Sequence, residues 1–158
     1  MSTPPSRPTG PRVVVDTGVF WRGIVRVSAG DTLNGKFVRA GLFENRYTLL
    51  YSAEILQEYL ETPIKHPKMA HRLHITEERL ALVARLVVQG GRVVHVHSPI
   101  RACRDPGDDK FLACAVDGQG DLIVSADQDL LELTGFRNIP ILPVPMAWSW
   151  LEQQEKHG

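Results

Sequence analysis

Acidic residues follow two of the apolar segments of this chain. Asp16 comes directly after the valines at 13–15, and Asp127 follows the apolar residues 122–124 after a Ser-Ala pair. In open α/β sheets, ligands bind in the crevice outside the carboxyl ends of the strands. We therefore expect both carboxylates to border one binding crevice.

Two helical patterns carry further acids. Asp108 and Asp109 open an apolar helical stretch that leads toward Asp127, and Glu58 lies about two turns into another helix. Carboxylates that converge repel one another unless a cation neutralises them, and Mg²⁺ takes oxygen ligands. The pattern predicts a divalent-metal site formed by Asp16, Glu58, Asp109 and Asp127.

The chemistry that such a site permits is metal-assisted hydrolysis of a phosphate ester. Mg²⁺ keeps several of its waters when only a few carboxylates bind it, so a substrate phosphate has room beside it. A metal-bound water of lowered pKa attacks phosphorus, and the metal stabilises charge on the phosphoryl and leaving oxygens. No serine, cysteine or histidine nucleophile is then required.

Each acid taken alone also has a structural explanation. Aspartate is common at strand exits, in turns and at helix N-caps, where its side chain accepts backbone hydrogen bonds. Asp105 fits an N-cap, and Asp129 and Glu132 fit solvated positions on a helix. The metal-site hypothesis depends on four acids from independent elements meeting at one edge of a sheet.

Length and composition set the class of protein. The chain has 158 residues, the length of one domain, and its 18 Lys and Arg residues balance 18 Asp and Glu residues. Net charge therefore gives no general attraction to nucleic acid or membranes, and a polyanion would need a local basic patch. The absence of a Cys-x-x-Cys pair and of a secretion signal predicts a reduced, cytoplasmic protein. No apolar run approaches the roughly 20 residues of a membrane span, so no membrane partner is expected.

Periodicity predicts one α/β domain. Residues 1–11 are rich in proline and lack apolar periodicity, which predicts a disordered lead-in before a single domain over residues 12–158. Five short apolar runs predict strands, and helical patterns separate them. This alternation predicts right-handed crossovers and a mostly parallel sheet covered on both faces. The predicted strands cover residues 13–15, 47–51, 92–96, 122–125 and 139–142.

Four segments carry the acids in a fixed order. They are Asp-Thr-Gly-Val at 16–19, the helical segment 52–58 from Ser to Glu, Arg-Asp-Pro-Gly-Asp-Asp-Lys-Phe-Leu at 104–112, and Ser-Ala-Asp-Gln-Asp-Leu-Leu at 125–131. At these residues the sequence resembles the PIN-domain nucleases, in particular the branch described as toxin components of toxin–antitoxin systems and related to VapC-like toxins. Four ordered motifs at compatible spacing are far more specific than any one acidic triplet.

The resemblance implies a fold, an activity and a set of site residues. The implied fold is a PIN-like three-layer α/β/α domain with a mostly parallel central sheet of about five strands. The implied protein is a toxin that hydrolyses RNA as a Mg²⁺- or Mn²⁺-dependent endoribonuclease, has an antitoxin partner and forms a homodimer. Carried over to this sequence, the catalytic and metal-binding acids are Asp16, Glu58, Asp109 and Asp127, with Asp108 as the substitute for Asp109.

Basic residues near the acids are candidate contacts to an RNA backbone. Lys and Arg side chains neutralise phosphates along grooves that follow a nucleic-acid strand. As ordinary solvated side chains, these residues would need no such role. The candidates are Arg22, Arg26, Arg104 and Lys110.

One position departs from the family pattern. The usual Asn of the Asp-Thr-Asn-Val motif is Gly18 here, and the loss of a polar side chain that helps hold the carboxylates predicts weak metal binding or slow cleavage. A second hypothesis is therefore a degenerate PIN domain that binds RNA or a protein partner without cutting. A third is phosphatase or phosphorelay chemistry at Asp16, which needs another acid beside it that Thr17 and Gly18 do not supply.

Overall fold

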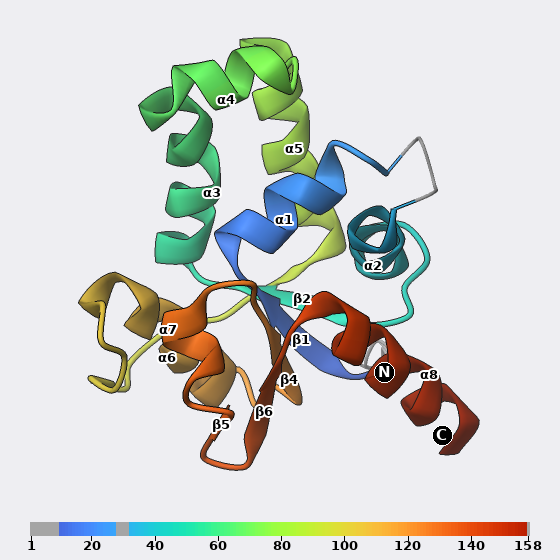
Figure 1. The fold of residues 1–158 in the computed structure, drawn as a ribbon, viewed down its shortest axis with the longest axis vertical. Coiled ribbons are helices and arrows are strands. Elements are labelled where there is room, and N and C mark those ends of the chain that lie inside the picture. Colours follow the sequence, from blue (N-terminus) through green and yellow to red (C-terminus); the bar gives the residue numbers. More distant parts are fainter. Residues whose placement is uncertain (1–9, 28–31, 158) are drawn as a thin grey trace, which may run out of the picture.

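A six-stranded sheet lies at the centre of residues 10–27 and 32–157, the part of the chain that the computed structural model describes (Figure 1). Its strands are β1 (Arg12–Val15), β2 (Thr48–Tyr51), β3 (Arg92–Val93), β4 (Leu122–Val124), β5 (Gly135–Phe136) and β6 (Ile139–Leu142). The order across the sheet is β3-β2-β1-β4-β6-β5, and every neighbouring pair is parallel except the antiparallel pair β5–β6. Residues 1–9 of the predicted lead-in lie outside the described residues.

β1 and β4 form the centre of the sheet. Every residue from Val13 to Val15 and every residue of β4 is at most 1% exposed, as expected of parallel strands covered on both faces. Val15 pairs with Val124, and the N–H of Asp16 donates to the carbonyl of Val124 at 2.9 Å. The two strands therefore end level, and the residues that follow them emerge at the same edge of the sheet.

Helices cover both faces of the sheet. In chain order they are α1 (Thr17–Ile24), α2 (Leu33–Leu42), α3 (Ala53–Lys65), α4 (Pro67–Arg72), α5 (Glu77–Gly90), α6 (Asp109–Asp117), α7 (Gln128–Leu131) and α8 (Val144–His157), with a 3-10 turn (Pro106–Asp108) before α6. The connections from β1 to β2 and from β2 to β3 advance across the sheet, whereas the connection from β3 to β4 returns. Right-handed crossovers therefore place α6 on the face opposite α2 and α5, and α8 packs against α2. This confirms the expected three-layer α/β/α fold.

α3 is fixed against the end of β1. Ser52 caps the helix by accepting a hydrogen bond from the N–H of Ile55 at 3.2 Å, and Ile55 and Tyr59 are buried on its core face. The Tyr59 hydroxyl donates to the carbonyl of Val15 at 2.5 Å. This contact holds Glu58, the residue before Tyr59, at the edge of the sheet where β1 ends.

The sheet differs from the prediction at two strands. β3 covers two residues instead of the five expected, because after Val94 the chain leaves the sheet and runs toward α6. β5 was not predicted; it pairs with β6 through a tight turn in which Arg137 and Asn138 have φ of 49° and 67°. None of the helices in the described part of the chain combines the length and apolar character needed to cross a bilayer.

Candidate functional site

Asp16 lies at the junction of β1, β4 and α1. Its Oδ1 accepts a hydrogen bond from the N–H of Val19 at 2.9 Å, which makes Asp16 the N-cap of α1. Its Oδ2 accepts hydrogen bonds from the Ser125 hydroxyl and, at 3.1 Å, from the N–H of Ala126. The side chain is 6% exposed, and burial raises the pKa of Asp16 although these hydrogen bonds oppose the rise. A buried carboxylate is thus tied to the ends of both central strands.

Four carboxylates border a cavity of 220 Å³ beside the ends of β1 and β4, which we call the acidic cavity. Asp16 and Asp127 follow the central strands, and Glu58 comes from α3. The fourth is Asp108, the last residue of the 3-10 turn before α6. The structure therefore brings together Asp16, Glu58 and Asp127, as the sequence pattern predicted, and the fourth acid is Asp108, the predicted substitute, in place of Asp109.

Asp108 is the least satisfied of these acids. Its Oδ2 is buried and has no hydrogen-bond partner among the described residues. Burial, followed by the negative charges of Asp127 and Asp105, raises its pKa to about 7. Among the described residues, Asp108, Asp127 and Asp129 each offer an oxygen within 4.8 Å of the others. A cation bound here would reduce the repulsion among the carboxylates and would give the Asp108 Oδ2 a partner.

Glu58 has partners on both carboxylate oxygens. Its Oε2 accepts a hydrogen bond from the Thr17 hydroxyl, and its Oε1 lies 2.7 Å from the Lys110 Nζ. The Lys110 and Glu58 side chains are 19% and 32% exposed. A charged pair in this partly buried position is screened less than a pair on the open surface.

Asp109 lies outside the acidic cavity. Its Oδ1 accepts hydrogen bonds from the N–H groups of Ala102 and Cys103, at 3.0 and 2.8 Å. Burial would raise the pKa of Asp109, but these hydrogen bonds hold it below its ordinary value. Successive residues of a helical turn project in different directions, so Asp108 faces the acids while Asp109 faces the preceding loop. The sequence shows an Asp-Asp pair but contains no signal for which member faces the cavity.

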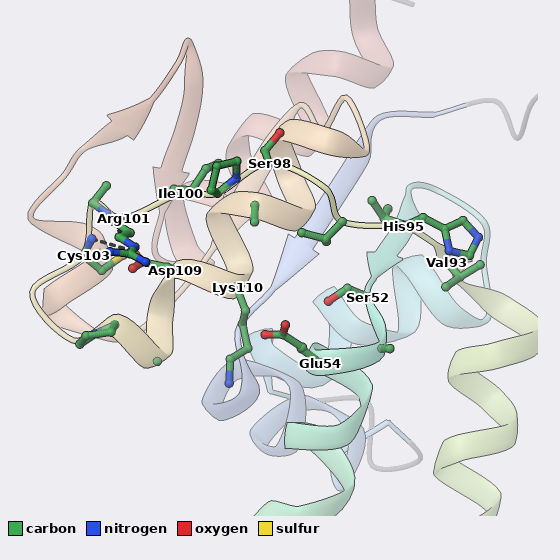
Figure 2. Close-up of a pocket in the computed structure, with 18 residues that line it drawn as sticks. Ser52, Glu54, Val93, His95, Ser98, Ile100, Arg101, Cys103, Asp109 and Lys110 are labelled. Atoms are coloured by element: carbon green, nitrogen blue, oxygen red, sulfur yellow. Dashed lines mark hydrogen bonds between the residues drawn. The ribbon is translucent and has the colours of Figure 1, made fainter.

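The loop that Asp109 holds is residues 94–105, which we call the crossover segment. Asp117, at the other end of α6, accepts hydrogen bonds at its Oδ2 from the N–H groups of His97 and Ser98, at 2.7 and 2.9 Å. The crossover segment, β3 and the start of α3 enclose a groove of 1110 Å³, the crossover groove (Figure 2). Lys110 lines this groove and contacts Glu58, which lines the acidic cavity.

The candidate RNA contacts occupy different places. Arg22 lines the acidic cavity, whereas Arg26 lines a neighbouring cavity of 520 Å³ that Arg22 also borders. Arg104 forms an ion pair with Glu132 at 2.8 Å. Lys110 is engaged by Glu58, so the structure brings only Arg22 to the acids without a carboxylate partner among the described salt bridges.

Position 18 has space for a side chain. A Cβ on Gly18 would lie 3.9 Å from the Asp16 Oδ1 and 4.0 Å from an Arg22 guanidinium nitrogen, both ordinary van der Waals distances. Thr17, Ser125 and Asp129 are not among the residues predicted for the site, although the structure places them beside its acids. Thr17 and Ser125 flank the strand-end acids within the motifs, which is the signal that could have identified them, since carboxylates at such sites need oriented donors.

Comparison with known proteins agrees with the motifs. A sequence model of the PIN domain matches residues 12–129. The chain resembles the T. brucei RRP44 PIN domain at 12% identity and a TM-score of 0.50, covering 95% of this chain and 86% of that chain. It also resembles Mycobacterium tuberculosis VapC20, described as a Sarcin-Ricin loop cleaving toxin, at 19% identity and a TM-score of 0.48, covering 81% of this chain and 98% of that chain. No curated protein matches the chain by sequence.

Proposed function

The chain belongs to the PIN-domain family, and we propose that it is a metal-dependent endoribonuclease whose divalent cation is held by Asp16, Asp108 and Asp127. The observation that carries the proposal is the buried Oδ2 of Asp108, which has no hydrogen-bond partner among the described residues and lies in a group of acids. A set of carboxylate oxygens suits Mg²⁺ or Mn²⁺. Asp108 would thus take the role that the resemblance implied for Asp109.

Residues around the acidic cavity would position the metal-binding carboxylates and the substrate phosphate. A bound Mg²⁺ or Mn²⁺ supplies a water of lowered pKa and stabilises charge on the phosphoryl oxygens. Ser125 and the N–H of Ala126 fix the Asp16 carboxylate, which keeps one acid in place at the ends of the central strands. Arg22, at the wall of the acidic cavity, has guanidinium donors suited to the non-bridging oxygens of a substrate phosphate.

A toxin role in a toxin–antitoxin pair is part of the proposal. It is supported by the order and spacing of the four acidic motifs, which resemble that branch of the family. The partners would be an RNA substrate, an inhibitory antitoxin and a second copy of the chain in a homodimer. Induced expression in a bacterial host should arrest growth, and expression of the Asp127→Asn variant should not.

Cleavage of a fluorescent single-stranded RNA tests the proposed chemistry. The wild type should cut the RNA with Mn²⁺ or Mg²⁺ and stop when EDTA is added, while Asp108→Asn and Asp127→Asn should not cut. Glu152→Gln, which removes one charge from an exposed position of α8, is the matched control and should cut normally. Full cleavage by both aspartate variants would contradict the site.

A second candidate function is RNA or protein binding without cleavage, and Gly18 is the observation that favours it. The open space beside the Asp16 Oδ1 is where a polar side chain at position 18 would help orient the carboxylate. If the wild type binds the RNA but does not cut it with either metal, the non-catalytic role is supported. Cleavage that depends on Asp108 contradicts it.

A further inference from the structure

One acid of the acidic cavity, Glu58, already has a cation as its partner, supplied by Lys110 from the adjoining crossover groove. Lys110 places its ammonium 2.7 Å from the Glu58 Oε1, and the Thr17 hydroxyl donates to the other oxygen of the same carboxylate. We propose that Lys110 takes the place of a second metal at Glu58, so that the site holds a single divalent ion on the side of Asp108 and Asp127. This inference rests on the proposed function.

The carboxylates fall into two groups according to their partners. Asp108, Asp127 and Asp129 offer oxygens within 4.8 Å of one another, and neither Asp16 nor Glu58 is a member of this group of described residues. Asp16 faces the negative charge of Asp127, whereas Glu58 faces the ammonium of Lys110. The Asp108 Oδ2 has no hydrogen-bond partner within the described part of the chain, whereas both oxygens of Glu58 are engaged. The need for an added cation is therefore confined to one side of the cavity.

A second ion would have to compete with Lys110. Two-metal sites place their ions roughly 3.5–4 Å apart, and each ion needs its own carboxylate oxygens at about 2.0–2.1 Å. An ion on Glu58 would have to displace the ammonium or bind beside it and suffer like-charge repulsion. Lys110 therefore limits the metal count as well as holding Glu58 in position.

The fold keeps Lys110 in this place. It is the second residue of α6, and Figure 2 shows its side chain extending away from that helix along one side of the crossover groove. The side chain is 19% exposed, so its stem is largely enclosed by protein. In contrast, Lys65 pairs with Glu61 on the outer surface of α3 at 3.1 Å and is 69% exposed. The Lys65–Glu61 pair is the matched control for Lys110–Glu58, and its loss should not change the number of ions bound.

Counting bound Mn²⁺ tests the inference without measuring cleavage. Free Mn²⁺ is measured by electron paramagnetic resonance during titration of the purified chain. The wild type and Lys65→Met should each bind one ion per chain, and Lys110→Met, which keeps the stem but removes the charge, should bind two. Two ions in the wild type, or one in Lys110→Met, would overturn the inference, whereas no ion in the wild type would contradict the proposed function itself.

A second variant keeps the test decisive if Lys110→Met does not fold. Glu58→Gln in the wild-type background should still bind one ion, with a Kd within about threefold of the wild type, because Glu58 is not among the acids that need the ion. Loss of the ion in Glu58→Gln would show that Glu58 is a metal ligand and would overturn the inference. Circular dichroism confirms the fold of each variant before titration.

Discussion

The first turn of α6 separates two sets of carboxylates with opposite surroundings. At the crossover segment, Asp117 accepts a hydrogen bond from the Ser98 hydroxyl, and both Asp109 and Asp117 accept hydrogen bonds from consecutive backbone N–H groups. These bonds hold both pKa values below the ordinary value although burial opposes this. In the acidic cavity, Asp16 and Asp108 have raised pKa values, because burial disfavours their charged forms and Asp127 adds like charge. Two aspartates adjacent in sequence thus belong to different sets.

The difference distinguishes acids that organise the backbone from acids that need a ligand. A carboxylate whose donors outweigh its burial, so that its pKa is lowered, is stabilised in its charged form, and a cation adds little. The pKa of Asp16 stays raised despite its three donors. A buried carboxylate oxygen without a donor has the most to gain from a cation. Asp108 meets the second description, and Asp109 meets the first.

The largest difference is expected between Asp108→Asn and Asp109→Asn. Asp108→Asn should weaken Mn²⁺ binding by at least about 100-fold, because it removes the charge of a proposed ligand, whereas Asp109→Asn should stay within about 10-fold. Isothermal titration calorimetry measures both. If Asp109→Asn loses the metal and Asp108→Asn keeps it, the assignment of the two residues is reversed.

Metal should stabilise the fold through the acidic cavity alone. At a hundredfold excess over Kd, Mn²⁺ should raise the free energy of unfolding of the wild type by about 2.7 kcal/mol, and that of Asp127→Asn much less. In EDTA, Asp127→Asn should melt no lower than the wild type, since it removes repulsion among crowded carboxylates. Thermal melts with and without metal measure both effects, and equal metal shifts would place the ion elsewhere.

At the crossover segment, loss of Asp117 should lower the stability of the fold and leave metal binding unchanged. Asp117→Ala should lower the free energy of unfolding by about 1–3 kcal/mol, because it leaves the N–H groups of His97 and Ser98 without their acceptor. Urea unfolding measures the loss, and hydrogen exchange should quicken at these two amides. Unchanged exchange there would mean that Asp117 does not hold the segment.

In EDTA, the contributions of Asp108 and Asp117 to the stability of the fold should change with pH in opposite directions. The pKa of Asp108 is raised to about 7 in the folded state, so its contribution to stability is complete below its ordinary value of 3.8 and is lost as pH rises through 7. Asp117 has a lowered pKa, so its contribution is present above the ordinary value and is lost as pH falls. As the pH rises from about 5 to about 8, the Tm of Asp108→Asn should therefore fall less than the Tm of the wild type. An identical pH profile for both would contradict the raised pKa.

The smallest effect is expected from Gly18→Asn. The side chain fits beside the Asp16 Oδ1 and could donate to it, so metal affinity should rise by less than about 10-fold. Titration of both proteins with Mn²⁺ measures the change. If the variant folds normally and binds metal no better, the missing side chain at position 18 does not weaken the site.

The central strands could be predicted because burial on both faces leaves a continuous apolar run. The valines of β1 and the residues of β4 show such runs, so the edge position of Asp16 followed from the sequence. β5 has only two residues and depends on the turn through Arg137 and Asn138. Arginine is unusual at positive φ, so this hairpin carries little local signal. β3 is short because the residues that follow it are held by Asp117 of α6, which is 20 residues beyond His97.

The acidic site could be predicted as a set but not in its detail. Asp16, Glu58 and Asp127 meet as expected, because Asp16 and Asp127 follow the apolar runs of the central strands and Glu58 lies in a helix with a clear N-cap at Ser52. The division between Asp108 and Asp109 depends on the direction in which each side chain leaves the first turn of α6. The partnership of Lys110 with Glu58 joins two helices far apart in sequence, and no local pattern encodes it.

The two aspartates that hold the crossover segment also constrain its length. The eight residue steps from Asp109 to Asp117 advance about 12 Å along α6. Between the anchored N–H groups of Ser98 and Ala102, four residues reach at most about 13–14 Å, which is little more than the advance between the two anchoring aspartates. Deleting one residue there would pull an anchor away, and inserting one would force a bulge. Natural variants that keep both aspartates should therefore vary in the identity of these residues and not in their number.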